Sequence, residues 1–108
     1  MGNFFVYITT NPRKSVLYTG MTNSLEQRLV EHFLNRGNQK TFAGKYYCYF
    51  LIHYERLPTP SKAIEREKEI KAMSRAQKIK LIETENPKWH FLNKSIMDWP
   101  PDPEITSR

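Results

Sequence analysis

The chain has 108 residues, of which 39% are hydrophobic and 26% are charged. A chain of this size buries one modest core, so we expect a single domain rather than several. Its formal charge of +6 and pI near 9.6 suit an anionic partner such as nucleic acid, although a basic surface that only confers solubility has the same composition.

The single cysteine, Cys48, excludes an internal disulfide bond and a cysteine-based zinc site. The N-terminus lacks the charged start and long apolar run of a signal peptide, and no stretch reaches the ~18 consecutive apolar residues of a membrane span. The sequence therefore predicts a cytoplasmic protein with no membrane partner.

Two β-prone runs open the chain. Residues 4–9 and 15–20 are rich in aromatic and β-branched side chains, and Asn11-Pro12 breaks the first run. The short connection favours an antiparallel hairpin, in which Tyr7 and Tyr18 can share a face.

A helix is predicted next, because Ser24 and Gln27 stand at capping-box spacing ahead of an apolar stripe that runs to about Asn35. At about 100° per residue, Arg28 and His32 fall together at one edge of that stripe. They can therefore point into a cleft at the edge of the sheet, although such a pair taken alone is also typical of a solvated helix face.

The middle of the chain is polar and then aromatic. Residues 38–45 predict a mobile loop whose Lys40 and Lys45 contact the ligand. Residues 46–54 form the longest apolar and aromatic run and predict the central strand of the sheet. Their rings suit base stacking, but burial in the core is the stronger expectation for a central strand.

Two more helices are predicted from their caps. Thr59 with Pro60 begins one that runs to about Met73, and Ser74 begins another that ends before Asn86. The order of elements predicts an α+β domain over residues 1–93, with a three-stranded, mainly antiparallel sheet flanked by three helices (ββαβαα).

The last residues differ in composition from the rest. Residues 94–108 hold three of the seven prolines and little periodicity, which is typical of a tail. Trp99 is the one aromatic residue there and could hold the segment down.

Among the glutamates of the Thr59-capped helix, Glu67 is unusual. A helical wheel places it between Ala63 and Ile64, inside the apolar stripe that also includes Ile70, whereas Glu65 and Glu69 lie roughly opposite. A carboxylate there is costly unless it binds a cation or is paired. The spacing leaves a metal ligand and a buried ion pair with Arg28 or a lysine equally open.

Taken together, these residues resemble the GIY-YIG nuclease family. The residues that carry the resemblance, in the family's order, are Phe5-Val6-Tyr7, Tyr18-Thr19-Gly20, Arg28, His32, Glu65-Arg66-Glu67 and Asn93. The likeness covers about residues 4 to 93 and is closest to the short stand-alone bacterial members of the endonuclease type. Two departures stand out: Phe5-Val6 replaces Gly-Ile, and Met21 replaces a lysine that follows YIG in some members.

The resemblance implies a metal-dependent endonuclease. Glu67 would hold one Mg²⁺ or Mn²⁺, bound mostly by water, and Arg28 would face the non-bridging phosphate oxygens. Tyr18 and His32 would orient phosphate or water. Tyr7 would be the general base, with His32 as the competing candidate because its pKa already suits the task.

The implied partner is nucleic acid, with DNA cut in repair, in recombination or according to its structure as the favoured substrate. Larger members gain specificity from attached DNA-binding domains, and none is expected here, so relaxed or structure-directed cutting is favoured over recognition of a long sequence. Contacts to it are assigned to Lys40, Lys45, Lys71 and Asn93. Two alternatives remain open: a basic nucleic-acid-binding module that does not cut and needs no metal, and a protein-interaction domain.

Overall fold

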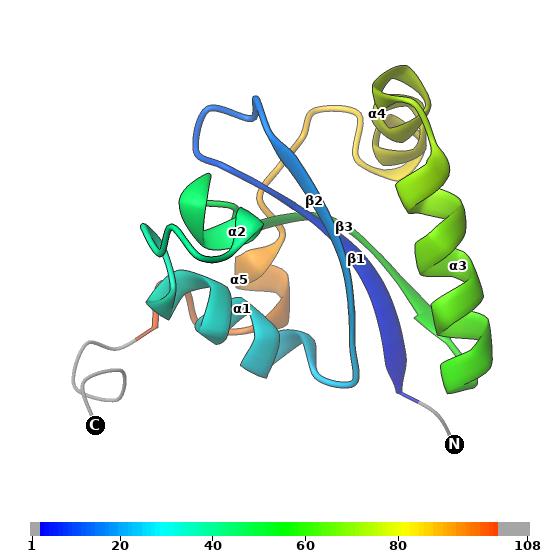
Figure 1. Ribbon diagram of the computed structural model, residues 1–108, viewed down its shortest axis with the longest axis horizontal. Helices are drawn as coiled ribbons and strands as arrows, with labels where there is room; N and C mark the ends of the chain where they lie inside the picture. Colours follow the sequence, from blue (N-terminus) through cyan, green and yellow to red (C-terminus); the bar gives the residue numbers. More distant parts are fainter. Residues whose placement is uncertain (1–2, 102–108) are drawn as a thin grey trace.

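The protein is built on one antiparallel sheet. The computed structural model describes residues 3–101. The three strands, in the spatial order β2-β1-β3, are β1 (Phe4–Thr10), β2 (Leu17–Thr22) and β3 (Phe50–Leu57) (Figure 1). β1 is the central strand, and its residues from Val6 to Thr10 are buried.

The prediction that residues 46–54 form the central strand is wrong. β3 starts only at Phe50 and lies at an edge of the sheet. Tyr46 and Tyr47 belong instead to a tight turn, in which Tyr47 has a φ of 59° and its N–H bonds to the carbonyl of Gly44. The aromatic run in the sequence is longer than β3, because its first two tyrosines are exposed residues of the turn before the strand.

The hairpin of β1 and β2 has the predicted geometry. Tyr7 pairs with Gly20, and Thr9 pairs with Tyr18, so both tyrosines lie on one face of the sheet. The connecting turn is closed by the side chain of Asn11, whose Oδ1 accepts from the N–H groups of Ser15 and Val16 at 2.8 and 3.0 Å.

The three predicted helices are present, with the predicted caps. Ser24, Thr59 and Ser74 each accept a hydrogen bond from the backbone three residues on, and the Ser74 cap is a full capping box. Two further helices of four residues were not predicted, since one turn leaves no apolar period to read. The helices are α1 (Leu25–Leu34), α2 (Phe42–Lys45), α3 (Pro60–Ala72), α4 (Arg75–Glu85) and α5 (Asn93–Ile96).

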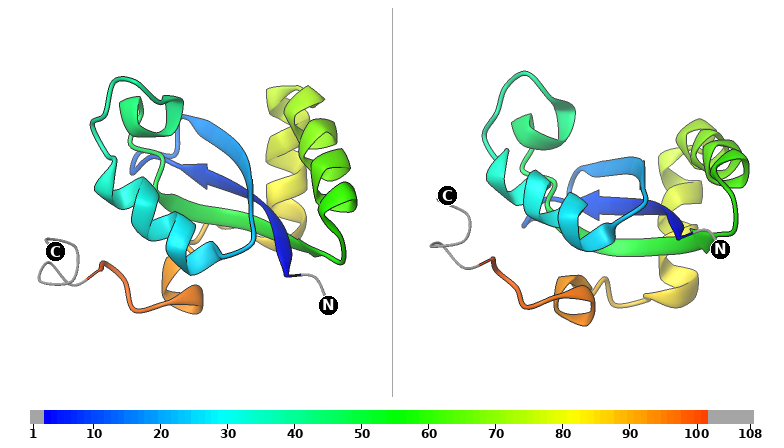
Figure 2. Two further views of the ribbon diagram at one scale, coloured as in Figure 1. Left: turned by 60° about the horizontal axis from the view of Figure 1, so that its bottom comes forward. Right: turned by 90° about the horizontal axis from the view of Figure 1, so that it is seen from below.

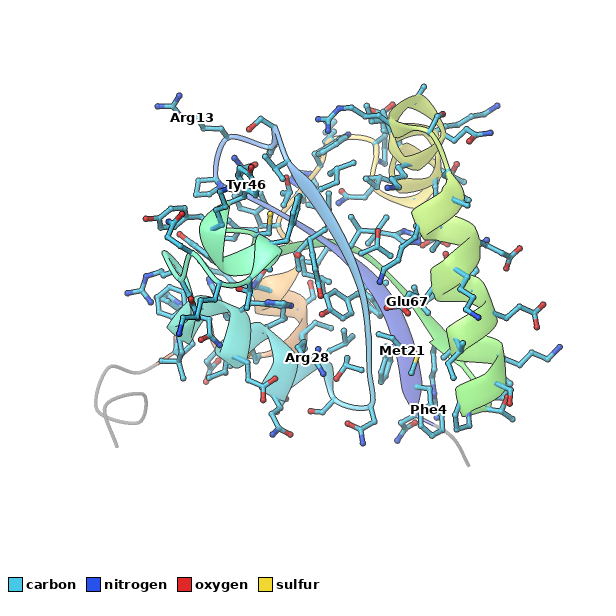
Figure 3. All side chains as sticks on the ribbon, in the orientation of Figure 1. Phe4, Arg13, Met21, Arg28, Tyr46 and Glu67 are labelled. Carbon is cyan, nitrogen blue, oxygen red and sulfur yellow. The ribbon has the colours of Figure 1, made fainter. Side chains whose placement is uncertain are left out.

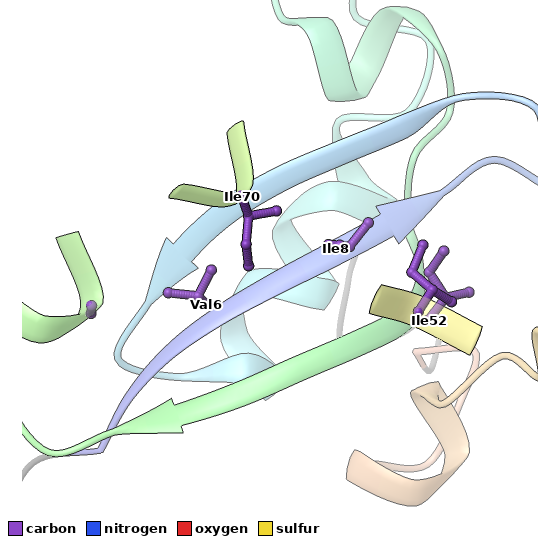
Figure 4. Packing of buried hydrophobic residues seen from close by; sticks show 6 residues of the cluster. Val6, Ile8, Ile52 and Ile70 are labelled. Atoms are coloured by element: carbon purple, nitrogen blue, oxygen red, sulfur yellow. The ribbon is translucent and has the colours of Figure 1, made fainter. Parts of the chain in front are cut away.

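Helices cover both faces of the sheet, which confirms the α+β class. On one face α3 and α4 pack on a core that includes Val6, Ile8, Ile52 and Ile70 (Figure 4). On the other face Tyr7 packs with residues of α1, β3 and the segment around α5. Figure 2 shows α1 and α5 at one side of the sheet and α3 and α4 at the other.

The segment after residue 93 packs against this second core. Ile96, Met97 and Trp99 all contact it, and the Trp99 ring lies 5.3 Å from that of Phe33. Trp99 thus holds down the beginning of the predicted tail. Residues 102–108 lie outside the described residues, and the domain boundary at residue 93 stays a prediction. Within residues 3–101, no helix is long and apolar enough to cross a membrane.

Candidate active site

The site begins with a close contact between the two paired strands. Tyr7 is fully buried, and its phenol lies directly over Gly20 of β2. A Cβ atom at position 20 would stand 2.6 Å from Cζ of Tyr7 and still closer to its hydroxyl oxygen, so only glycine leaves room for the ring. The sequence prediction included Gly20 in the motif Tyr18-Thr19-Gly20 but gave this residue no role. A glycine inside a strand was the signal for this close approach.

The Tyr7 hydroxyl reaches a histidine on α1. Tyr7 Oη and His32 Nε2 are 2.8 Å apart, at hydrogen-bonding distance. The Tyr18 ring closes the group: its centroid lies 5.3 Å from that of His32 and 6.3 Å from that of Tyr7. The structure therefore brings together three of the residues predicted for the catalytic site.

Burial decides the protonation of this pair. It raises the pKa of Tyr7 well above its usual value, with a further rise from Tyr18, while nearby Arg28 lowers it and Glu67 raises it slightly. Burial, with Arg28, also lowers the pKa of His32 to about 4. At neutral pH both groups are therefore uncharged. The direction of their hydrogen bond follows the histidine tautomer: with the proton on Nδ1, His32 accepts a hydrogen bond from the phenol at Nε2.

Arg28 supplies positive charge beside the pair. Its guanidinium lies 3.1 Å from Glu31 on the same helix, and its side chain is 36% exposed. An exposed ion pair of this kind is weak, so Glu31 leaves Arg28 free to meet an anion. Figure 3 shows Arg28 and Glu67 on opposite sides of β2, reaching in from α1 and α3.

Glu67 is less buried than the helical wheel predicted. Its side chain is 22% exposed, and its Oε2 lies 3.4 Å from the ammonium of Lys71, one turn on. The apolar stripe is narrow: Ala63 and Ile70 are buried, but Ile64 is 43% exposed. The expectation of a carboxylate buried in the apolar stripe was therefore wrong. Of the two ion-pair partners that the spacing left open, Arg28 and a lysine, the structure places a lysine beside Glu67.

The surroundings of Glu67 suit a cation that keeps most of its water ligands, such as Mg²⁺, better than one enclosed by several protein ligands. Within residues 3–101 no group of three His, Cys, Asp or Glu side chains could enclose a metal. A single accessible carboxylate is compatible with Mg²⁺, which keeps several waters and takes one or two protein oxygens. Lys71 contributes only an exposed, i,i+4 contact that an ion of higher charge can displace.

The four predicted nucleic-acid contacts fall into different places. Lys40 and Lys45 are exposed, and the Lys45 ammonium lies over the Tyr46 ring at 5.4 Å. Lys71 faces Glu67. The structure contradicts the prediction that Asn93 contacts nucleic acid. Asn93 is 1% exposed, and its side chain accepts a hydrogen bond from the N–H of Leu51 at 2.7 Å and donates one to the carbonyl of Tyr49 at 3.0 Å. Because its amide is used inside the protein, Asn93 positions β3 and does not contact a ligand.

One polar network was missed from the sequence. Arg66 contacts both carboxylate oxygens of Glu55 on β3, at 2.7 and 3.0 Å, and buried His53 bonds to the same carboxylate at 2.8 Å. Burial would raise the pKa of Glu55, but these hydrogen bonds bring it below its usual value. Arg66 directly precedes Glu67, so the network holds the middle of α3 against the sheet. The signal was a histidine within an apolar strand.

Comparisons with known proteins agree with this arrangement. The family model described as the GIY-YIG catalytic domain matches residues 3–80. A UPF0213 protein of Staphylococcus haemolyticus is 37% identical over 83 residues, covering 77% of this chain and 98% of that protein. One from Natronomonas pharaonis is 38% identical over 81 residues, covering 75% and 92%. No solved structure gives a significant match. The matched region contains both tyrosines, Arg28, His32 and Glu67, and this chain belongs to the GIY-YIG nuclease family.

Proposed function

We propose that this protein is a metal-dependent endonuclease that hydrolyses phosphodiester bonds, with DNA as its substrate. The observation that carries the proposal is the 2.8 Å contact between Tyr7 Oη and His32 Nε2. A phenol lying over a glycine, bonded to a neutral imidazole and set beside an arginine, is a costly arrangement for a core that needs only packing. It suits proton transfer next to an anion.

Tyr7 and His32 act as one unit in the proposed mechanism. Burial disfavours a phenolate formed in advance. Tyr7 is fully buried in the free protein, so the proposal requires that bound substrate exposes its hydroxyl. Tyr7 then takes the proton of the attacking water as it passes its own proton to His32. With its pKa lowered to about 4, His32 is unprotonated at neutral pH, so its Nε2 is available, but it is a weaker base than the ordinary histidine that the sequence predicted. Tyr7 and His32, the two candidates for general base, are therefore hydrogen-bonded to each other.

The charged residues complete the site. Arg28 binds the non-bridging phosphate oxygens, where negative charge grows during the reaction. Glu67 would hold the Mg²⁺ or Mn²⁺ ion, which when bound neutralises phosphate charge and assists departure of the leaving oxygen. Tyr18 packs against His32 and keeps its ring in position.

The test compares wild-type protein with Glu67→Gln on labelled DNA and RNA, with Mg²⁺, with Mn²⁺ and with EDTA. Glu65→Gln is the matched control, because Glu65 is an exposed carboxylate on the same helix. We expect metal-dependent cleavage by wild type and by Glu65→Gln, and none by Glu67→Gln. Cleavage by a folded Glu67→Gln variant would contradict the metal role.

One observation favours the alternative of a binding module that does not cut. Glu67 already has a cationic neighbour, Lys71, and so does not require a metal for neutralisation. Under this alternative the same experiment gives binding without cleavage, equal in Mg²⁺ and in EDTA and weaker at higher salt.

A further inference from the structure

A row of aromatic rings runs outward from the candidate active site. The Tyr18 and Phe42 rings are stacked, with centroids 6.3 Å apart and planes 26° apart. The Phe42 ring in turn lies 4.9 Å from that of Tyr46. Phe42 is 51% exposed and Tyr46 38% exposed. The row therefore starts at a tyrosine that packs on His32 and ends at the surface.

The outer rings are held on a fixed support. Thr41 caps α2 by accepting from the N–H of Gly44, whose carbonyl accepts from Gly37 at 2.8 Å. A Cβ at Gly44 would stand 2.6 Å from the carbonyl oxygen of Asn35, so α2 lies tight against the end of α1. Figure 3 shows Tyr46 beside α2. The rings are thus exposed by a built turn rather than by a loose loop.

The charge around the row is positive. The sequence has no acidic residue between Glu31 and Glu55, whereas Lys40 and Lys45 lie within that stretch. The Lys45 ammonium lies over the outermost ring of the row. Aromatic rings beside cations suit a strand whose bases are free to stack and whose phosphates need countercharges. An apolar protein segment would gain nothing from these lysines.

We propose that Phe42 and Tyr46 stack on unpaired bases next to the phosphate held at Arg28, so that the protein selects a single-stranded substrate or one with an unpaired flank. This rests on the proposed function, because it concerns the substrate of the same site. A paired duplex hides its base faces in its own stack and cannot use the row, whereas any unpaired base can, whatever its sequence.

The test measures binding in EDTA by fluorescence anisotropy, so that no cleavage occurs. The probes are a short single-stranded DNA, the same strand with abasic positions, and a blunt duplex. We expect Phe42→Ala and Tyr46→Ala each to weaken binding of the single strand by about 5- to 100-fold, the effect of losing one stacked base. Phe42→Trp keeps a ring and should retain affinity. Tyr54→Ala, an exposed aromatic on the opposite edge strand, is the matched control.

The abasic strand identifies the contact. If the rings stack on bases, abasic positions weaken wild-type binding but cost Phe42→Ala much less, because the partner is already missing. Equal abasic penalties in both proteins, or duplex binding that Phe42→Ala weakens as much, would overturn the stacking surface. Cleavage assays stay separate: absence of metal-dependent cutting would overturn the proposed function and leave this binding result standing. Circular dichroism confirms that each variant is folded.

Discussion

At the scale of single residues, Gly20 and Tyr7 depend on each other. The hydroxyl of Tyr7 fills the space that a side chain at position 20 would need. We expect Gly20→Ala to destabilise the protein by about 1–3 kcal/mol, as overpacking does in other cores, and to abolish cleavage by displacing the phenol. Urea unfolding measures the first effect and a cleavage assay the second.

Thr19 provides the control for that substitution. Its hydroxyl is buried on the opposite face of β2 and has no hydrogen-bond partner among residues 3–101. Thr19→Val removes a buried polar group at nearly constant volume, so it should leave the protein equally stable or more stable by about 1 kcal/mol. A loss of stability in Thr19→Val as large as in Gly20→Ala would show that β2 is merely intolerant of change.

His32 should make stability depend on pH. Its pKa is lowered to about 4 in the folded protein. Between that value and the ordinary histidine pKa of ~6.5, the unfolded chain binds a proton that the folded chain does not, so stability falls as pH drops through this window. We expect wild type to lose up to about 3 kcal/mol more than His32→Gln over this range, less if solvent screens the partly exposed ring. Parallel urea titrations of the two proteins at several pH values check this. Equal pH dependence would contradict it.

At the scale of elements, Asn93 ties the segment around α5 to the start of β3. Its two hydrogen bonds satisfy the N–H of Leu51 and the carbonyl of Tyr49, both remote in sequence. Asn93→Ala should cost about 2–4 kcal/mol, because the buried N–H of Leu51 and the partly buried carbonyl of Tyr49 are both left unpaired. Thermal or urea unfolding measures the loss. Asn35→Ala, an exposed asparagine that bonds within its own turn, should change stability by less than about 0.5 kcal/mol.

The elements also show which features a sequence can reveal. The helix caps at Ser24, Thr59 and Ser74 were predicted because capping is local chemistry within four residues. The position of β3 was not, because helices cover both faces of this sheet and an edge strand then carries as many apolar residues as a central one. One-turn helices such as α2 leave no periodic signal.

The residues of the candidate site also fall into those that could be predicted from local sequence and those that could not. Tyr7 and Tyr18 were placed on one face from strand alternation, and Arg28 with His32 from helical spacing. The exposure of Glu67 could not be predicted, since a wheel gives the direction of a side chain and not the width of the covered stripe. Contacts between distant segments, such as Arg66 with Glu55 or Phe42 with Tyr18, depend on packing that no local pattern encodes.

At the scale of the whole molecule, the net charge of +6 should govern association. Binding of a single strand should weaken with salt, with log K falling against log[salt] by about 0.7 for each neutralised phosphate. Lys45→Gln should make that slope shallower by about 0.7, the value for one phosphate contact. Lys80 lies on α4 across the sheet, so Lys80→Gln should leave the slope unchanged. Anisotropy titrations at several salt concentrations give the slopes. Equal slopes in all three proteins would remove Lys45 from the interface.

The central position of β1 has a consequence for how activity is lost on heating. Amide protons in a buried central strand exchange with solvent only when the whole domain opens, so those of Tyr7 and Ile8 should be among the slowest to exchange. The tyrosine that we propose as the proton-transfer group then belongs to the last part of the molecule to unfold. Cleavage should persist up to global melting rather than fade beforehand, and hydrogen exchange followed residue by residue would show whether Tyr7 opens with the domain.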